Sequence, residues 1–146
     1  MRINLRTTYA IYIIVDIITN QSGDKLIRAK DIAQRQLIPM KYVMQILLSL
    51  KNNGVLESFR GRQGGYKLAV ETNKLSMAEI VRIMDPITID NTMPNKSCKY
   101  TETTITINKI WMEVKNKILR ELQEATFDKI CSYIKTQEKN VLNYSI

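Results

Sequence analysis

The chain has 146 residues, 45% of them hydrophobic, so it is long enough to form one domain with a sizeable core. Its formal net charge is +8, and it contains two cysteines and no histidine. This composition argues against a disulfide framework, excludes histidine-based catalysis and histidine-ligated metal sites, and predicts a polyanionic partner.

The excess positive charge lies in the first half of the chain. Residues 1–70 contain eleven Lys and Arg against four Asp and Glu, whereas residues 71–146 contain eleven against ten. Nucleic acid and an anionic membrane surface are the alternative partners for such a basic half, and solubility alone is the plainer explanation. The apolar run over residues 9–18 is too short to cross a bilayer, and no signal-peptide cleavage site follows it, so we expect a cytoplasmic protein.

Three helices are predicted in this basic half. The first covers residues 7–20 and is apolar almost all round, so other elements should cover it on several sides. A short extended piece at Leu26 and Ile27 precedes a second helix over residues 29–36. The third covers residues 39–53, because Pro39 suits a first helical position and Gly54 suits the position after a helix end. The second and third helices form a helix-turn-helix candidate.

The third helix has two chemically different faces. An apolar stripe is expected to face the core and consists of Val43, Ile46, Leu47 and Leu50. The opposite face mixes amide, cationic and apolar side chains and consists of Lys41, Met44, Gln45, Leu48, Ser49 and Asn52. Such a mixture can contact base edges and phosphates.

A tight two-stranded hairpin is predicted directly after the third helix. Its strands cover residues 55–60 and 65–69, and residues 61–64 form the turn. Arg60 and Arg62 flank Gly61 at the tip, so two cations with little bulk around them suit a minor groove or a row of phosphates. A helix-turn-helix followed by such a hairpin predicts a winged helix.

The second half of the chain predicts a short helix, a long loop and two further helices. Ser76 and Glu79 form a capping box for the short helix, which runs to about Asp85 before Pro86. Residues 86–104 are expected to be a loop, and loops of this length in compact domains are commonly functional or disordered. The long helix follows, and Thr126 is expected to cap the last one.

The long helix has an apolar seam with heptad-like spacing. The seam consists of Ile107, Trp111, Val114, Ile118 and Leu122, and Ala125 continues it. We expect a second copy of the chain to cover it, because DNA-binding proteins of this size generally bind paired half-sites through two-fold symmetry. The alternative is that the seam packs on the first helix of the same chain.

Five stretches of the chain resemble the bacterial IscR/CymR/NsrR family of transcription regulators, the Rrf-two superfamily. These stretches are Met1–Ile11, Asp31–Ala33, Ile38–Leu47, Arg60–Tyr66 and Met77–Val81. The pairing of Tyr42-x-x-Gln45 with Arg-Gly-x-x-Gly-Gly-Tyr is quite specific, and the position of Trp111 extends the match to about residue 125. The resemblance implies a dimer of winged helices that binds a palindromic operator, with the long helix forming the dimer.

The resemblance also implies roles in DNA binding. The helix around residues 41–45 would enter the major groove, Gln45 would contact bases and Arg60 would probe the minor groove. Some relatives have a glutamate where this chain has Met44, so an acceptor for cytosine N4 is replaced by an apolar contact that suits a thymine methyl. We therefore expect a more A·T-rich operator. The candidate DNA-contacting residues are Arg2, Lys30, Lys41, Tyr42, Met44, Gln45, Arg60 and Arg62.

The chain departs from the family in the sensing loop. Iron–sulfur members have three cysteines there and a histidine or an acidic residue as fourth ligand, whereas this loop has Cys98 alone. A cluster needs about four ligands, so we expect no iron–sulfur cofactor and no metal unless both chains or glutathione supply the ligands. Two interpretations of Cys98 stay open: a redox-reactive thiol whose pKa is lowered by Lys96 and Lys99, or a remnant without a role. We expect Cys131 to be a small core residue.

The predicted fold is mainly α with a small β-hairpin. It comprises a winged helix-turn-helix domain over residues 1–85, an effector or sensor loop over 86–104, and a dimerisation helix with a C-terminal helix over 105–146. The predicted function is a dimeric repressor that binds double-stranded DNA at a palindromic operator and responds to a small-molecule or protein effector. The alternative is a protein-interaction module controlled by docking a metabolic enzyme. We do not expect an enzyme, because the sequence has no histidine, no phosphate loop and no clustered carboxylates.

Overall fold

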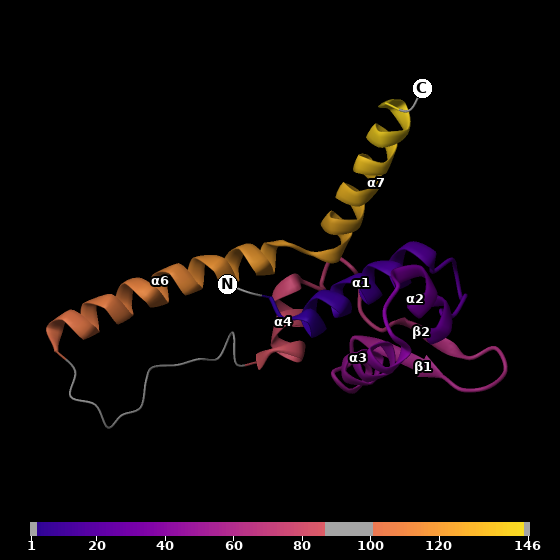
Figure 1. The fold of residues 1–146 in the computed structure, drawn as a ribbon, viewed down its shortest axis with the longest axis horizontal. Coiled ribbons are helices and arrows are strands. Elements are labelled where there is room, and N and C mark those ends of the chain that lie inside the picture. Colours follow the sequence, from indigo (N-terminus) through magenta and orange to yellow (C-terminus); the bar gives the residue numbers. More distant parts are fainter. Residues whose placement is uncertain (1–2, 87–100, 145–146) are drawn as a thin grey trace.

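The computed structural model describes residues 3–86 and 101–144, with side chains as far as residue 140. The chain forms a compact body from which two helices extend (Figure 1). The elements of the body are α1 (Leu5–Asn20), α2 (Ala29–Gln36), α3 (Met40–Asn52), β1 (Leu56–Phe59), β2 (Gly65–Leu68) and α4 (Met77–Met84). The two extending helices are α6 (Glu102–Glu124) and α7 (Phe127–Tyr144).

Helix α1 is the centre of the body. It contacts α2, α3, α4, α7 and β2, as expected for a helix that is apolar almost all round. The predicted inward stripe of α3 is confirmed, since its four residues have no exposed area. The largest fully buried side chains include Ile13, Ile14, Ile17, Ile32, Ile46, Leu47, Leu50, Leu56, Leu75, Ile80 and Phe127.

The hairpin is held against the start of α2. Strands β1 and β2 pair antiparallel, with Leu56 opposite Leu68 and Phe59 opposite Gly65. The predicted extended piece at Ile27 adds an isolated bridge, in which Ile27 N donates to Tyr66 O at 2.9 Å and Tyr66 N donates to Ile27 O at 2.8 Å. A Cβ at Gly65 would lie 2.7 Å from Ile27 O, so the close approach of the two backbones requires glycine at this position.

Helix ends differ from the prediction by one to three residues. Helix α1 starts at Leu5 because Asn4 Oδ1 accepts a hydrogen bond from Thr7 N at 2.8 Å. Pro39 is the N-cap of α3 instead of its first residue, because its ψ of 134° is extended. Helix α6 starts within the predicted loop, at Glu102, because Thr101 Oγ1 accepts from Thr104 N at 3.2 Å. Ser76 caps α4 as predicted.

Backbone hydrogen bonds join the corner between α6 and α7 to the start of α4. Met77 N donates to Ala125 O at 3.0 Å, and Phe127 N donates to Leu75 O at 2.9 Å. Thr126 precedes the first residue of α7, and its hydroxyl donates to the Asp128 carboxylate, which lowers the pKa of that carboxyl. The extending helices are therefore attached to the body through a hydrogen-bonded corner.

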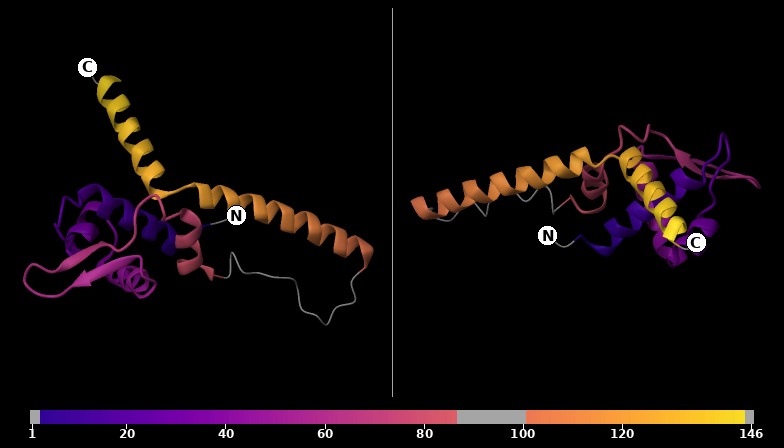
Figure 2. Two further views of the ribbon diagram at one scale, coloured as in Figure 1. Left: turned by 180° about the vertical axis from the view of Figure 1, so that it is seen from behind. Right: turned by 90° about the horizontal axis from the view of Figure 1, so that it is seen from above.

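Helix α6 points away from the body, on the side opposite the hairpin, in all three views (Figures 1 and 2). It contacts helix α4 of the body. Ile107, Trp111 and Val114 of the seam are 60%, 69% and 43% exposed, so packing on α1 does not bury them in the single chain. None of the helices within the described ranges is long and apolar enough to span a bilayer.

Candidate nucleic-acid interface

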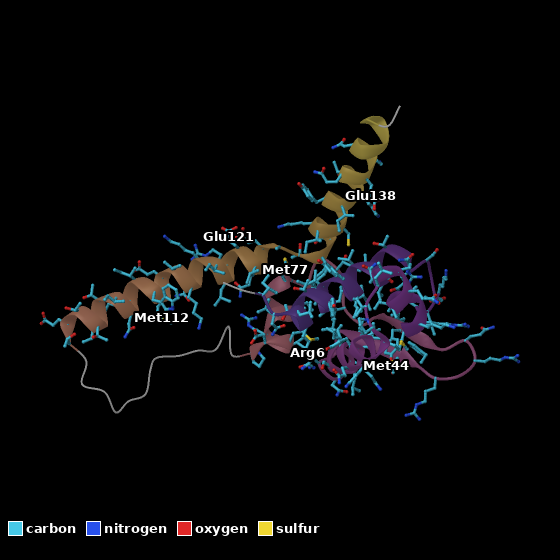
Figure 3. All side chains as sticks on the ribbon, in the orientation of Figure 1. Arg6, Met44, Met77, Met112, Glu121 and Glu138 are labelled. Atoms are coloured by element: carbon cyan, nitrogen blue, oxygen red, sulfur yellow. The ribbon has the colours of Figure 1, made fainter. Side chains whose placement is uncertain are left out.

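Helix α3 presents a continuous outward face on the same side of the body as the hairpin. Lys41, Gln45 and Asn52 are exposed there, and Met44 and Leu48 lie among them. Figure 3 shows the side chains of the body, with Met44 labelled on α3. Because the buried stripe fixes the rotation of α3, these side chains must point away from the core. The face can offer one cation, two amides and two apolar groups to a ligand.

Two contacts brace α3 against α1. Arg6 Nη2 donates to Ser49 Oγ at 2.8 Å, and the rings of Tyr9 and Tyr42 meet edge to face with centroids 6.0 Å apart. Tyr42 was predicted to contact DNA; its side chain is 44% exposed, so it can do so while it packs on Tyr9. Ser49 was predicted on the outward face; it is half-buried, and its hydroxyl accepts the hydrogen bond from Arg6.

The hairpin tip presents Arg60 and Arg62, and both residues are exposed. Gly61 has a φ of +112°, which an L side chain rarely adopts, and a Cβ at Gly64 would lie 2.3 Å from Phe59 O. Arg28 Nη2 donates to Arg62 O at 3.2 Å, so a side chain at the N-cap of α2 reaches the tip. The glycines therefore shape the turn, and Arg28 adds a link between the turn and the helix-turn-helix.

An ion pair with a buried carboxylate holds α2 to α1. Asp16 is 2% exposed, and its carboxylate accepts from Arg35 Nη2 at 2.7 Å, from Arg35 Nε at 3.0 Å and from Gln36 Nε2 at 2.8 Å. The hydrogen bond to Asp16 raises the pKa of Arg35. The charge of Asp16 is thus paired and hydrogen-bonded, which is the condition under which burial of a carboxylate is tolerated. The pair sets the position of the first helix of the helix-turn-helix.

The other residues predicted to bind DNA, sense an effector or form the dimer differ in exposure, and two of them lie outside the described part of the chain. Lys30 is exposed on the first turn of α2. Arg2 and Cys98 lie outside the described residues, as does most of the predicted effector loop. Ile118 and Leu122, in the half of the seam nearer the body, are half-buried, whereas Ile107, Trp111 and Val114 are exposed.

Sequence reasoning missed Arg6, Arg28 and the ion pair of Asp16 with Arg35. Arg6 and Arg28 are ordinary cations in the sequence, and their partners lie 43 and 34 residues away. One signal did exist, because Asp16 interrupts an otherwise apolar helix and a buried carboxylate needs a partner. The sequence alone does not say which cation supplies it.

A two-helix unit, a core helix behind it and a hairpin with a cationic tip together define a winged helix-turn-helix protein, which confirms the predicted fold class. The chain belongs to the Rrf2 family: the family model described as an iron-dependent transcriptional regulator matches residues 3–133. It is therefore a DNA-binding transcriptional regulator, as the sequence resemblance implied.

Several curated relatives are similar over most of their length. The chain is 28% identical over 127 residues to an HTH-type transcriptional regulator of Mycobacterium tuberculosis, which covers 86% of this chain and 78% of the relative. It is 27% identical over 146 residues to the regulator IscR of Pectobacterium atrosepticum, covering 98% and 84%. It is 23% identical over 145 residues to CymR of Bacillus subtilis, covering 99% of each chain. These relatives are regulators of transcription and not enzymes, and their descriptions give no support to control by a docked metabolic enzyme.

Solved structures show the same fold. The structure of CymR, the global cysteine regulator of B. subtilis, superposes with a TM-score of 0.77 at 22% identity and covers 91% of this chain and 98% of that one. The structure of IscR from T. potens superposes with a TM-score of 0.74 at 24% identity, covering 92% and 88%.

The donor set of this chain does not fit the iron that the family description names. The whole sequence holds two cysteines and no histidine, whereas an iron–sulfur cluster needs about four ligands. Cys131 is 7% exposed in α7, and burial raises the pKa of its thiol, which disfavours the thiolate that binds metals. Within residues 3–86 and 101–144 no three carboxylates or thiols come together as a metal site. One chain therefore lacks the ligands for such a cluster.

Proposed function

We propose that this chain is a homodimeric repressor that binds a palindromic operator. The supporting observation is the exposed seam of α6, which has Ile107, Trp111 and Val114 uncovered on a helix of 23 residues. A second α6 related by two-fold symmetry would bury the same residues of both chains, because a two-fold interface places the same patch on each subunit. Such a dimer would present two copies of α3 and of the hairpin.

In the proposed complex, the first turns of α3 lie in the major groove. Lys41, Met44 and Gln45 are exposed near the start of this helix, where recognition helices usually contact base edges. The Gln45 amide can bond adenine at N6 and N7, and Lys41 can bond guanine or a phosphate. Tyr42 lies at the edge of this face, where its hydroxyl suits a phosphate.

The hairpin tip and the start of the chain supply further contacts in this proposal. Arg60 enters the minor groove, whose narrow A·T stretches attract arginine, and Arg62 lies over phosphates. Lys30 on α2 and Arg2 each neutralise a phosphate of the DNA backbone. An effector at residues 86–104 releases DNA by changing the distance between the two α3 helices. That distance matters because the two half-sites lie about one helical turn, roughly 34–36 Å, apart.

Selection of bound duplexes from a random pool tests the operator. We expect a palindromic motif with two half-sites, and log affinity that falls linearly with log salt concentration, by about 0.9 for each phosphate contacted. In vitro transcription from a promoter that overlaps the selected site should fall as protein is added. A motif with a single half-site, or no enriched motif, would contradict the proposal.

Sedimentation of a seam variant tests the dimer. Trp111→Glu places a charge in the centre of the seam, and we expect it to yield monomers and to lose cooperative binding to the palindrome. Trp111 is 69% exposed in the single chain, so the subunit should still fold. Asn116→Glu is the matched control, because Asn116 is exposed and outside the seam of the same helix. Equal masses for the two variants would refute the assignment of the seam.

A further inference from the structure

The outward face of α3 contains two apolar side chains, Met44 and Leu48. They are 45% and 55% exposed, although both are large and apolar. They are four residues apart, so they lie on one side of the helix, a little more than one turn or about 6 Å along its axis from each other. The opposite side of the same helix is completely buried, so a rotation of α3 could hide this pair only by exposing the core.

The surroundings of the pair indicate what covers it. Lys41, Gln45 and Asn52 border it on α3, and the cationic hairpin tip lies on the same side of the body. A protein partner would have to neutralise Lys41 and the two arginines of the hairpin tip, whereas DNA supplies the complementary phosphates. The major groove offers one apolar group to a recognition helix, which is the C5-methyl of thymine.

We propose that Met44 and Leu48 each contact a thymine methyl in every half-site. This inference rests on the proposed function and deepens it, because it assigns Leu48 to base recognition and adds a second methyl contact to the one expected from Met44. Bases in one strand are spaced 3.4 Å along the axis, so side chains about one turn apart reach methyls one or two base steps apart. The pair therefore specifies two nearby thymines, while Gln45 and Lys41 contact polar edges beside them.

Deoxyuridine tests the inference, since it differs from thymidine by the methyl group alone. Each thymine of the selected half-site is replaced singly, and the dissociation constant is measured at fixed salt. Loss of one buried methyl should weaken binding about fourfold. It removes about 0.8 kcal/mol of binding free energy, and about 1.4 kcal/mol corresponds to a tenfold change in the dissociation constant. Two positions should respond, one or two steps apart, and thymines elsewhere should not.

Protein variants assign each methyl to its side chain. Met44→Ala should abolish the uridine effect at one position and Leu48→Ala at the other, because the methyl then has no partner. Lys41→Ala is the matched control on the same face; it should weaken binding and leave both uridine effects intact. Circular dichroism should show unchanged folding, because both apolar side chains are exposed.

The outcomes separate this inference from the proposed function. If the protein binds a palindrome and uridine has no effect, or if the half-site lacks thymines, the methyl contacts are wrong and the operator assignment stands. If Met44→Ala and Leu48→Ala keep the same difference in affinity between uridine and thymidine operators as the parent, the pair has another role. If no operator is enriched, the proposed function fails and this inference fails with it.

Discussion

Asp16 Oδ2 accepts a hydrogen bond from Arg35 Nη2 at 2.7 Å, and this ion pair joins the central helix α1 to the first helix of the helix-turn-helix. The carboxylate side is almost fully buried, with 1% of the side chain exposed, whereas the guanidinium side is 38% exposed. The two partners therefore differ in what their removal costs: loss of Arg35 leaves a buried charge, and loss of Asp16 leaves a cation that can reach water.

Arg35→Ala should lower the free energy of unfolding by about 3 kcal/mol, because it leaves the Asp16 carboxylate buried with Gln36 as its main remaining partner. Urea denaturation measures the loss. Arg82→Ala, on an exposed residue of α4, is the control and should change stability by less than about 0.5 kcal/mol. Equal effects of the two substitutions would show that the ion pair contributes nothing beyond a surface charge.

Gly65→Ala should displace the hairpin, because the new Cβ would lie 2.7 Å from Ile27 O and the hydrogen bonds between Ile27 and Tyr66 would have to break. We expect a loss of about 1–3 kcal/mol in stability and weaker operator binding. Gly23→Ala is the control: its φ is +55° and nothing lies within 4 Å of the added Cβ, so its cost is backbone strain alone, without an effect on operator binding. Hydrogen exchange at the Tyr66 amide should quicken only in Gly65→Ala.

Arg60→Ala should weaken operator binding by about 1–3 kcal/mol, because it removes the cation proposed for the minor groove. Gln45→Ala should chiefly relax the sequence preference, since its amide is proposed to contact base edges. Competition between the selected operator and operators with single base changes distinguishes the two effects. Parent-like binding by both variants would contradict the proposed docking of α3 and the hairpin.

Cys131 should make stability depend on pH in the alkaline range. Burial raises the pKa of its thiol above the ordinary value of 9.0, so the folded chain favours the neutral form. The resulting stabilisation is present below the unfolded pKa and is lost as pH rises through the folded pKa. In a Cys98→Ser background, urea denaturation should show the stability of the parent falling relative to Cys131→Ala above about pH 9. A constant difference from pH 7 to pH 10 would count against this effect.

Periodicity and turn residues were enough to predict much of the fold. The inward stripe of α3, the extended piece at Ile27, the hairpin and the capping of α4 by Ser76 are confirmed, because each depends on local sequence signals. The predicted start of α6 is wrong, because the predicted loop extended to residue 104 and the helix starts at Glu102. Its N-cap, Thr101, lies in a polar stretch that has no apolar periodicity to mark a helix start.

The features that could not be predicted from the sequence are contacts between residues far apart in the chain. The amphipathic pattern of α3 predicted which side chains lie off the buried stripe, and none of them is buried, although Ser49 also accepts a hydrogen bond from Arg6. Neither that contact nor the reach of Arg28 to the hairpin tip has a local signature, because each joins elements far apart in the chain. The roles of the outward residues in DNA binding stay predictions.

The hydrogen-bonded corner where Met77 and Phe127 pair with Ala125 and Leu75 has a mechanical consequence. It fixes α6 to α4, and α4 packs on α1, which also contacts α3. In the proposed dimer, each subunit would then move as one unit, with the seam on the extending helix α6 at one end and the DNA-facing helix at the other. A small change of angle between the two α6 helices would reach the operator undiminished, without any rearrangement inside a subunit.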